Sequence, residues 1–176
     1  MKKLLFTAIA LFIVSGVYAQ GIKVGIKAGA NLSTITDSDD AKMKLGFHIG
    51  GFLEFKFSDV LSLQPELLFS MQGAKQDGDL SVTMNTDYFN VPVLFKVKLV
   101  EGLSAEAGPQ LGFLVGGVDG KTEIDLTAAA GLSYTFAEKV VIGARYCFGL
   151  TKIFKEGGPI KAGKHSVIQF SLGYKF

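Results

Sequence analysis

The stretch IKVGIKAGANL at residues 22–32 alternates without interruption between apolar residues and polar residues or glycine. Ile22, Val24 and Ile26 fall on one side of this pattern, and Lys23 and Lys27 fall on the other. Successive side chains of a β-strand point to opposite faces, so a period of two is typical of a strand with one apolar face. The stretch therefore predicts such a strand.

The same alternation returns in seven further segments. They lie at residues 47–57, 61–71, 89–99, 103–115, 126–136, 140–150 and 168–176. No charged residue occupies an apolar-face position in any of them. Tight turns at 58–60, 100–102 and 137–139 alternate with longer polar connections at 33–45, 74–86, 116–123 and 152–164. We therefore predict an all-β fold, an eight-stranded antiparallel up-and-down β-barrel, because closure leaves no exposed strand edge.

The composition excludes several classes of protein. The 176 residues are 48% hydrophobic and 19% charged, which is too apolar for an intrinsically disordered chain. A single cysteine excludes an internal disulfide and a cysteine zinc cluster. The formal net charge of +2 is too small to indicate a nucleic-acid-binding protein.

The first nineteen residues have the pattern of a secretory signal peptide. Lys2 and Lys3 precede an apolar run at residues 4–14, and Val17 and Ala19 stand at the small-residue positions before Gln20. The run is shorter than the about 20 residues that a spanning helix needs. We therefore predict cleavage after residue 19, which leaves residues 20–176 as the barrel domain.

Period two does not show which way the apolar face points. Strands of this length can cross a bilayer at a tilt, and aromatic residues mark both ends of the apolar face, as in outer-membrane barrels. Many glycines on the polar face suit a narrow lumen. We therefore favour a transmembrane barrel of the Gram-negative outer membrane. A secreted soluble barrel of the lipocalin type, with its apolar face inside around an apolar ligand, is the alternative.

In-strand prolines count against a closed barrel, since proline cannot donate a ladder hydrogen bond. Pro65, Pro92 and Pro109 lie on consecutive predicted strands. We expect bulges or bends at these positions.

Three stretches resemble the PorT-like outer-membrane β-barrel domain family. They are GIKVGIKAGANLS at residues 21–33, YFNVPVLFK at 88–96 and LGYKF at 172–176. The resemblance implies a small outer-membrane barrel, and Tyr174 and Phe176 match by position the terminal aromatic signal that the barrel assembly machinery recognises. The named member of the family acts in protein secretion, so an accessory subunit of a secretion or assembly complex is a further alternative.

An eight-stranded barrel has an interior just wide enough for side chains, so we predict a plugged polar lumen. The charges expected to form its lumenal network, three cations and three anions, are Lys27, Glu54, Glu66, Lys96, Glu106 and Arg145. Lys27, Glu66 and Arg145 share one predicted depth, and the other three lie one step nearer the turns. A gated proton or ion path is the functional alternative.

Four more lysines fall one residue inside the turn end of their strands and are expected at a periplasmic rim. They are Lys23, Lys56, Lys98 and Lys175. Such a rim would attract an anionic partner or lipid headgroups.

No spacing indicates catalysis or metal binding. His48 and His165 have no paired motif, so we expect His48 to form hydrogen bonds inside the lumen and Cys147 to be an inert packed thiol. We predict no catalytic residue, no cofactor, no metal and no nucleic-acid partner. The expected function is a structural or surface-interaction role through four long external loops, with outer-membrane lipid and an envelope protein as partners.

Overall fold

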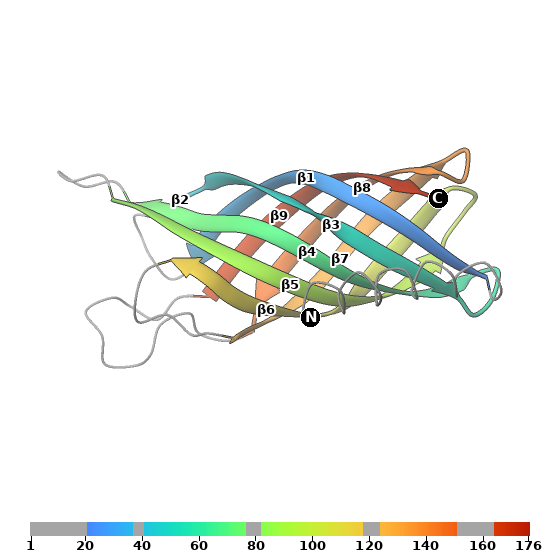
Figure 1. Cartoon of the computed structure of the whole chain (residues 1–176), viewed down its shortest axis with the longest axis horizontal. Helices are drawn as coiled ribbons and strands as arrows, with labels where there is room; N and C mark the ends of the chain where they lie inside the picture. Colours follow the sequence, from blue (N-terminus) through green and yellow to red (C-terminus); the bar gives the residue numbers. More distant parts are fainter. Residues whose placement is uncertain (1–20, 37–40, 77–81, 118–123, 151–163) are drawn as a thin grey trace, which may run out of the picture.

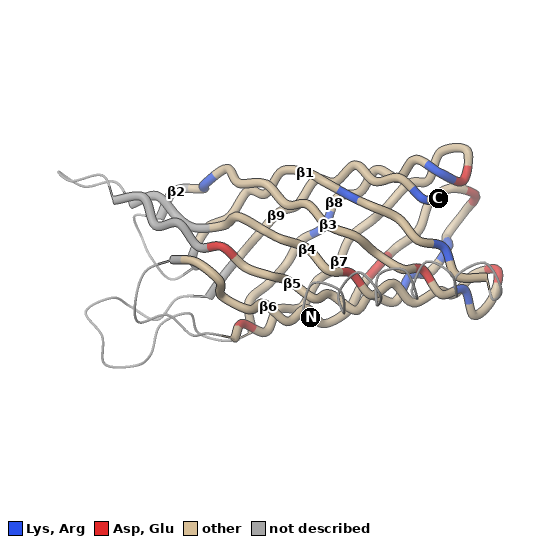
Figure 2. The backbone as a smooth tube through the Cα atoms, in the orientation of Figure 1, with Lys and Arg blue, Asp and Glu red and all other residues tan. Residues whose placement is uncertain are grey.

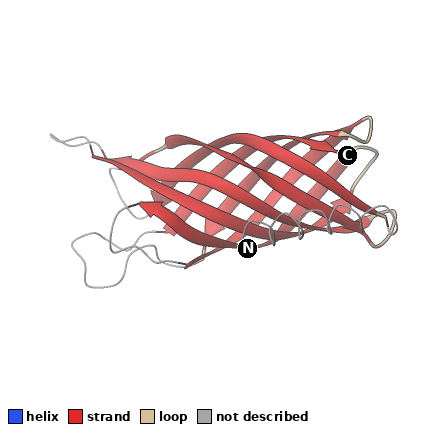
Figure 3. Cartoon of the chain, in the orientation of Figure 1, coloured by secondary structure: helices blue, strands red, loops and turns tan. Residues whose placement is uncertain are grey.

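The chain forms a closed barrel of antiparallel strands (Figure 1). A computed structural model describes residues 21–36, 41–76, 82–117, 124–150 and 164–176. The predicted signal peptide lies outside these residues. The strands are β1 (Ile22–Thr36), β2 (Ala41–Lys42), β3 (Lys44–Lys56), β4 (Leu61–Gln76), β5 (Val82–Lys98), β6 (Leu103–Gly117), β7 (Ile124–Phe136), β8 (Val140–Gly149) and β9 (Lys164–Lys175). The described residues include no helix (Figure 3).

Apart from the short β2, each strand pairs with the strands before and after it in the chain, and β1 pairs with β9 to close the sheet. The two-residue β2 continues the line of β3 along β4, displaced by one residue across Met43. The predicted eight-stranded antiparallel barrel is therefore confirmed. β1, β4 and β5 extend further than expected, because Thr36, Gln76 and Val82 belong to strands rather than to the predicted connections.

The apolar face of the sheet points outward. Phe95 and Leu67 are 54% and 57% exposed, whereas the inward-facing Glu66 and Arg145 are 3% and 4% exposed. The lipocalin-like alternative is therefore wrong, since it requires the apolar side chains to be inside. Charged residues gather mostly toward the end of the barrel that carries the short turns (Figure 2).

The prolines interrupt the ladder without shifting its register. The Cα pairs of β3 and β4 skip Pro65 and resume at Phe55 and Leu63 with the same offset, and the pairs of β4 and β5 do so across Pro92. The pairs of β5 and β6 are interrupted in the same way at Pro109. The register shift between β5 and β6 lies at Asp87 and Tyr88 instead. At the three prolines the ladder thus loses residue pairs without the expected bulge, because proline has no N–H to donate.

Candidate functional site in the barrel interior

Four charged side chains from four strands meet in the middle of the barrel. Arg145 on β8 donates from Nη1 and Nη2 to both carboxylate oxygens of Glu66 on β4, at 2.9 and 2.8 Å. Its Nε and Nη2 also donate to Glu106 Oε1 on β6, at 2.9 and 2.7 Å. Lys27 on β1 donates to Glu66 at 3.1 and 3.2 Å. We call these four residues the central charge cluster, and its formal charges cancel.

This arrangement follows from strand geometry. β4 and β8 are not neighbours in the sheet, so the bond between Arg145 and Glu66 crosses the lumen. The planar guanidinium matches a carboxylate with two parallel hydrogen bonds, and its second edge, Nε and Nη2, reaches Glu106. Buried charges persist only when they are paired and hydrogen-bonded, and the four residues meet that condition for one another.

A second group of charges lies toward the turns. Glu54 Oε2 is 2.7 Å from Lys175 Nζ and 3.6 Å from Lys96 Nζ. Lys96 Nζ also donates to Gln64 Oε1 at 3.0 Å, and Gln64 Nε2 donates to Glu66 Oε1 at 2.6 Å. We call Glu54, Lys96 and Lys175 the turn-end charge cluster, and Gln64 joins it to the central charge cluster.

The contacts differ from the expected depths in two ways. Glu106 was placed level with Glu54 and Lys96, but it binds Arg145 in the central charge cluster. Lys175 was expected at the rim, but it is 6% exposed and binds Glu54. Lys175 lies opposite Gly25, and the ring of Phe52 occupies the space that a side chain at Gly25 would need. Gln64 was not singled out from the sequence, although it stands on the inward face two residues before Glu66.

A network of neutral polar groups occupies the loop end of the interior. His48 Nδ1 lies 2.7 Å from Asn31 Oδ1, and His48 Nε2 lies 3.0 Å from Ser171 Oγ. Asn31 Nδ2 donates to Ser70 Oγ at 2.9 Å, and Gln72 Nε2 donates to the same oxygen at 3.0 Å. Both ring nitrogens of His48 are thus engaged with side chains. Among the described residues, no group of three or more His, Cys, Asp or Glu could hold a metal ion.

The interior also contains large apolar side chains that the sequence analysis did not place there. Phe52, Leu68 and Leu94 are at most 5% exposed and lie on the inward face. Leu94 packs with Val167 and Cys147 in a small cluster. The same period of two that identified Glu66 and Lys96 also leads to Leu68 and Leu94, two positions away. A void of about 20 Å³ between the two charge clusters leaves room for little more than one water molecule.

The three remaining rim lysines surround an open hollow at the turn end. Lys23, Lys56 and Lys98 line this hollow, whose volume is about 500 Å³, and Lys96 and Lys175 line it as well. Lys23 Nζ is 3.5 Å from Glu138 Oε2, in an exposed ion pair that contributes little stability. We call this hollow the vestibule.

The expected assembly residues, Tyr174 on β9 and Phe176 just after it, lie on the outer surface. The rings of Tyr174 and Phe176 are exposed and meet edge to face, with centroids 5.5 Å apart. They lie at the turn end of the barrel, where the chain ends (Figure 1).

Comparison with known proteins gives the same architecture. Residues 18–155 match the protein family described as "Outer membrane protein beta-barrel domain". The crystal structure of Neisserial surface protein A superposes with a TM-score of 0.60 at 17% identity, covering 89% of this chain and 100% of that one. Ail, the attachment invasion locus protein of Yersinia pestis, gives a TM-score of 0.51 at 19% identity, with 89% and 99% covered.

A second structure of Ail, in complex with the heparin analogue sucrose octasulfate, gives a TM-score of 0.55 at 19% identity, with coverage of 89% and 100%. These likenesses establish the fold. No curated protein matches the chain significantly. No helix in the described ranges is long and apolar enough to cross a membrane.

Proposed function

Because the chain belongs to the outer membrane protein beta-barrel domain family, we propose that it is a small structural barrel with a partner-binding surface at its loop end. In this proposal the protein is exported by a signal peptide at residues 1–19. The barrel assembly machinery inserts it with Tyr174 and Phe176 as the recognised aromatics. The short turns then face the periplasm and the long connections face outside, as in other bacterial outer-membrane barrels.

The pairing of inward charges carries this proposal. Arg145 binds Glu66 across the lumen and also binds Glu106, at 2.7–2.9 Å, and the inward-facing Phe52, Leu68 and Leu94 are buried. Such an interior supports a lumen filled by side chains rather than a diffusion channel. We therefore propose a plugged lumen, with the lumenal network of Lys27, Glu54, Glu66, Lys96, Glu106 and Arg145 as its polar part. The proposed role includes no catalysis and no cofactor.

A conductance measurement tests the plugged lumen. The purified protein is inserted into a planar lipid bilayer, and the current is recorded at both polarities. We expect no steady open-channel current, because the charges and apolar side chains occupy the cross-section. A steady ohmic current in every insertion would contradict the plugged lumen and favour the ion path.

Epitope tagging tests the orientation and the loop surface. A tag inserted in the connection at residues 152–164 is expected to bind antibody on intact cells. The matched control is the same tag in the turn at residues 137–139, which is expected to bind only after the outer membrane is opened. The reverse result would contradict the proposed orientation.

A second candidate is an accessory role in a secretion or assembly complex. The likeness of residues 88–96 to the PorT-like family supports it. Crosslinking of envelope membranes followed by purification tests this role, and recovery of the barrel without any secretion component would contradict it. The likeness of fold to the attachment protein Ail favours the loop-surface role instead.

A further inference from the structure

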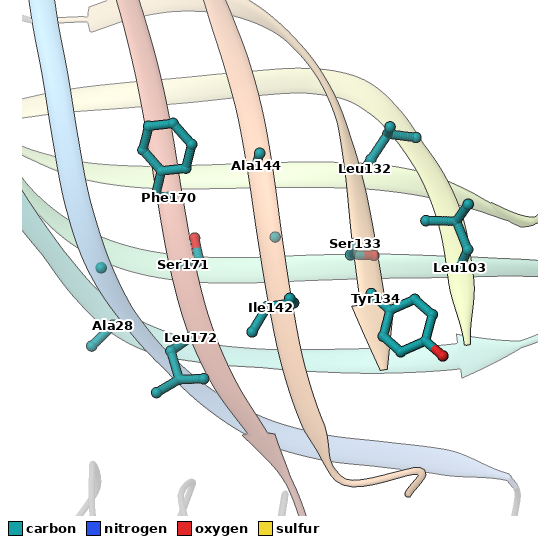
Figure 4. A pocket seen from close by; sticks show the side chains of 12 residues that line it. Ala28, Leu103, Leu132, Ser133, Tyr134, Ile142, Ala144, Phe170, Ser171 and Leu172 are labelled. Atoms are coloured by element: carbon teal, nitrogen blue, oxygen red, sulfur yellow. The ribbon is translucent and has the colours of Figure 1, made fainter. Parts of the chain in front are cut away.

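The outer surface carries a hollow on the side formed by β1, β9, β8, β7 and β6 (Figure 4). Its volume is about 550 Å³, within the usual range of about 300–1,000 Å³ for small-molecule sites. The hollow exists because small and large side chains alternate across the strands. Ala144 pairs with Leu132 on one side and with Phe170 on the other, and Ala28 pairs with Leu172. We call this hollow the outer groove.

The vestibule has the opposite chemistry. Five lysines line it, and the hydroxyl-bearing Ser62, Ser104 and Thr135 are close to them on the inward face. Its acidic residues are the buried Glu54 and the turn residues Asp59, Glu101 and Glu138, so lysines exceed acids by one. Lys56 and Lys98 are exposed and form no ion pair with any described residue at 4.0 Å or less. The vestibule therefore offers uncommitted cations and hydroxyl groups to an anion.

Tyr134 lies at the boundary between the two hollows and lines both of them. Neighbouring residues alternate between the two, since Leu103 lines the outer groove while Gly102 and Ser104 line the vestibule. Gly102 has a φ of +80°, and a Cβ there would lie 2.9 Å from Cζ of Tyr134. The tyrosine ring thus lies over the turn between β5 and β6, at the rim where the outer surface of the barrel meets its turn-end opening.

We propose that the two hollows together bind one phospholipid of the periplasmic leaflet. Its acyl chain lies in the outer groove, and its phosphate headgroup turns over the rim at Tyr134 to meet Lys56 and Lys98 in the vestibule. The charge of a phosphodiester complements the lysines, and the apolar chain complements Leu132, Phe170 and Leu172. This inference rests on the proposed function, because it requires the turn end to face the phospholipid leaflet.

Native mass spectrometry of the purified, delipidated barrel tests the proposal. Phosphatidylglycerol is added in a nonionic detergent, and the fraction of lipid-bound protein gives the affinity. The double variant Lys56→Gln/Lys98→Gln is expected to bind about 30-fold more weakly, since each lysine near a lipid headgroup contributes about 1 kcal/mol. Lys139→Gln is the matched control, because Lys139 lies at the same end but does not line the vestibule. It is expected to change binding less than twofold.

The outer groove is tested with a second pair of variants. Ala144→Phe fills the groove, and Ala130→Phe makes the same change at an exposed outward position that does not line it. We expect Ala144→Phe to weaken lipid binding about tenfold and Ala130→Phe to leave it unchanged. Ala28→Leu tests the groove in the same way if Ala144→Phe does not fold. Every variant is first required to migrate differently unboiled and boiled on an SDS gel.

Each outcome bears on the proposal. Loss of binding in both the lysine and the groove variants supports one lipid across the rim. If only the lysine variant loses binding, and glycerol 3-phosphate competes fully with the lipid, the site recognises free phosphate and the proposal is overturned. Equal binding by all variants also overturns it, because only nonspecific lipid then adheres. A wild-type chain that stays soluble and shows no gel shift would instead contradict the proposed function.

Discussion

The two halves of the barrel interior are stabilised by different chemistry. From the middle of the barrel to the turns, Arg145, Glu66 and Glu54 belong to clusters of full charges. Toward the loops, His48 and Asn31 belong to a network of imidazole, amides and hydroxyls. Both halves connect strands that are distant in the sequence, but they respond differently to the loss of one partner. A charge left alone in a buried site destabilises the fold far more than an unpaired amide does.

The largest effect is expected in the central charge cluster. Arg145→Met removes the hydrogen bonds to Glu66 and Glu106 and leaves two buried carboxylates with fewer partners. We expect a loss of about 3–5 kcal/mol in the free energy of unfolding. The chain has no tryptophan, so urea unfolding in lipid vesicles is followed by circular dichroism and by the gel shift of unboiled samples.

A double variant shows whether the loss of stability in Arg145→Met comes from the buried carboxylates that are left without their guanidinium partner. Arg145→Met/Glu66→Gln removes one of the two carboxylates together with the guanidinium. Recovery of part of the lost stability supports that cause, while additive losses would mean that the two residues stabilise the barrel independently.

The next effect distinguishes the turn-end charge cluster from the rim. Lys175→Met removes the 2.7 Å ion pair to Glu54, and we expect a loss of about 1.5–3 kcal/mol, the range for hydrogen bonds to charged groups. Lys23→Met is the control, because its pair with Glu138 is exposed. We expect about 1 kcal/mol or less for this change in the same unfolding assay. Equal losses of stability in the two variants would mean that the ion pair of Lys175 contributes no more than the exposed pair of a rim lysine.

A smaller effect is expected at the loop end. Asn31→Ala removes hydrogen bonds to Ser70 and to the backbone oxygens of Phe47 and Met71. The expected loss is about 1–3 kcal/mol, because the groups left behind are neutral. Urea unfolding of this variant beside Arg145→Met measures the contrast directly. If Asn31→Ala were the more destabilising change, the difference between the two halves would not depend on charge.

The smallest effect lies outside the interior, in the turn between β7 and β8. Ala137 and Glu138 have φ values of +44° and +61°, which non-glycine residues adopt at a cost. Ala137→Asn/Glu138→Gly supplies the residues that such a turn favours and is expected to stabilise the barrel by about 1 kcal/mol. A shift of the urea midpoint to higher concentration checks this, and Glu101→Gly in the neighbouring turn is the control.

Strands and faces were predictable because both depend on local alternation. Residues 22–32 carry their pattern in adjacent positions, and the sheet follows it. The partners of long side chains were less predictable, since Lys175 on β9 binds Glu54 on β3, a strand that does not pair with β9. Phe52, Leu68 and Leu94 were missed for a related reason. Their inward position follows from the period of two, but the prediction of a polar lumen named only charged residues.

The pairing of β1 with β9 closes the sheet into a ring, so no strand has a free edge that would mark it as first or last. The backbone N–H of Phe176 donates to the carbonyl oxygen of Val24 at 2.9 Å, so the two ends of the described barrel lie side by side. A chain joined there and opened at the turn between β5 and β6 would keep every strand pairing on its sheet. The order of the strands in the chain therefore affects when each strand is synthesised and reaches the membrane. The stability of the closed barrel depends only on which strands are neighbours.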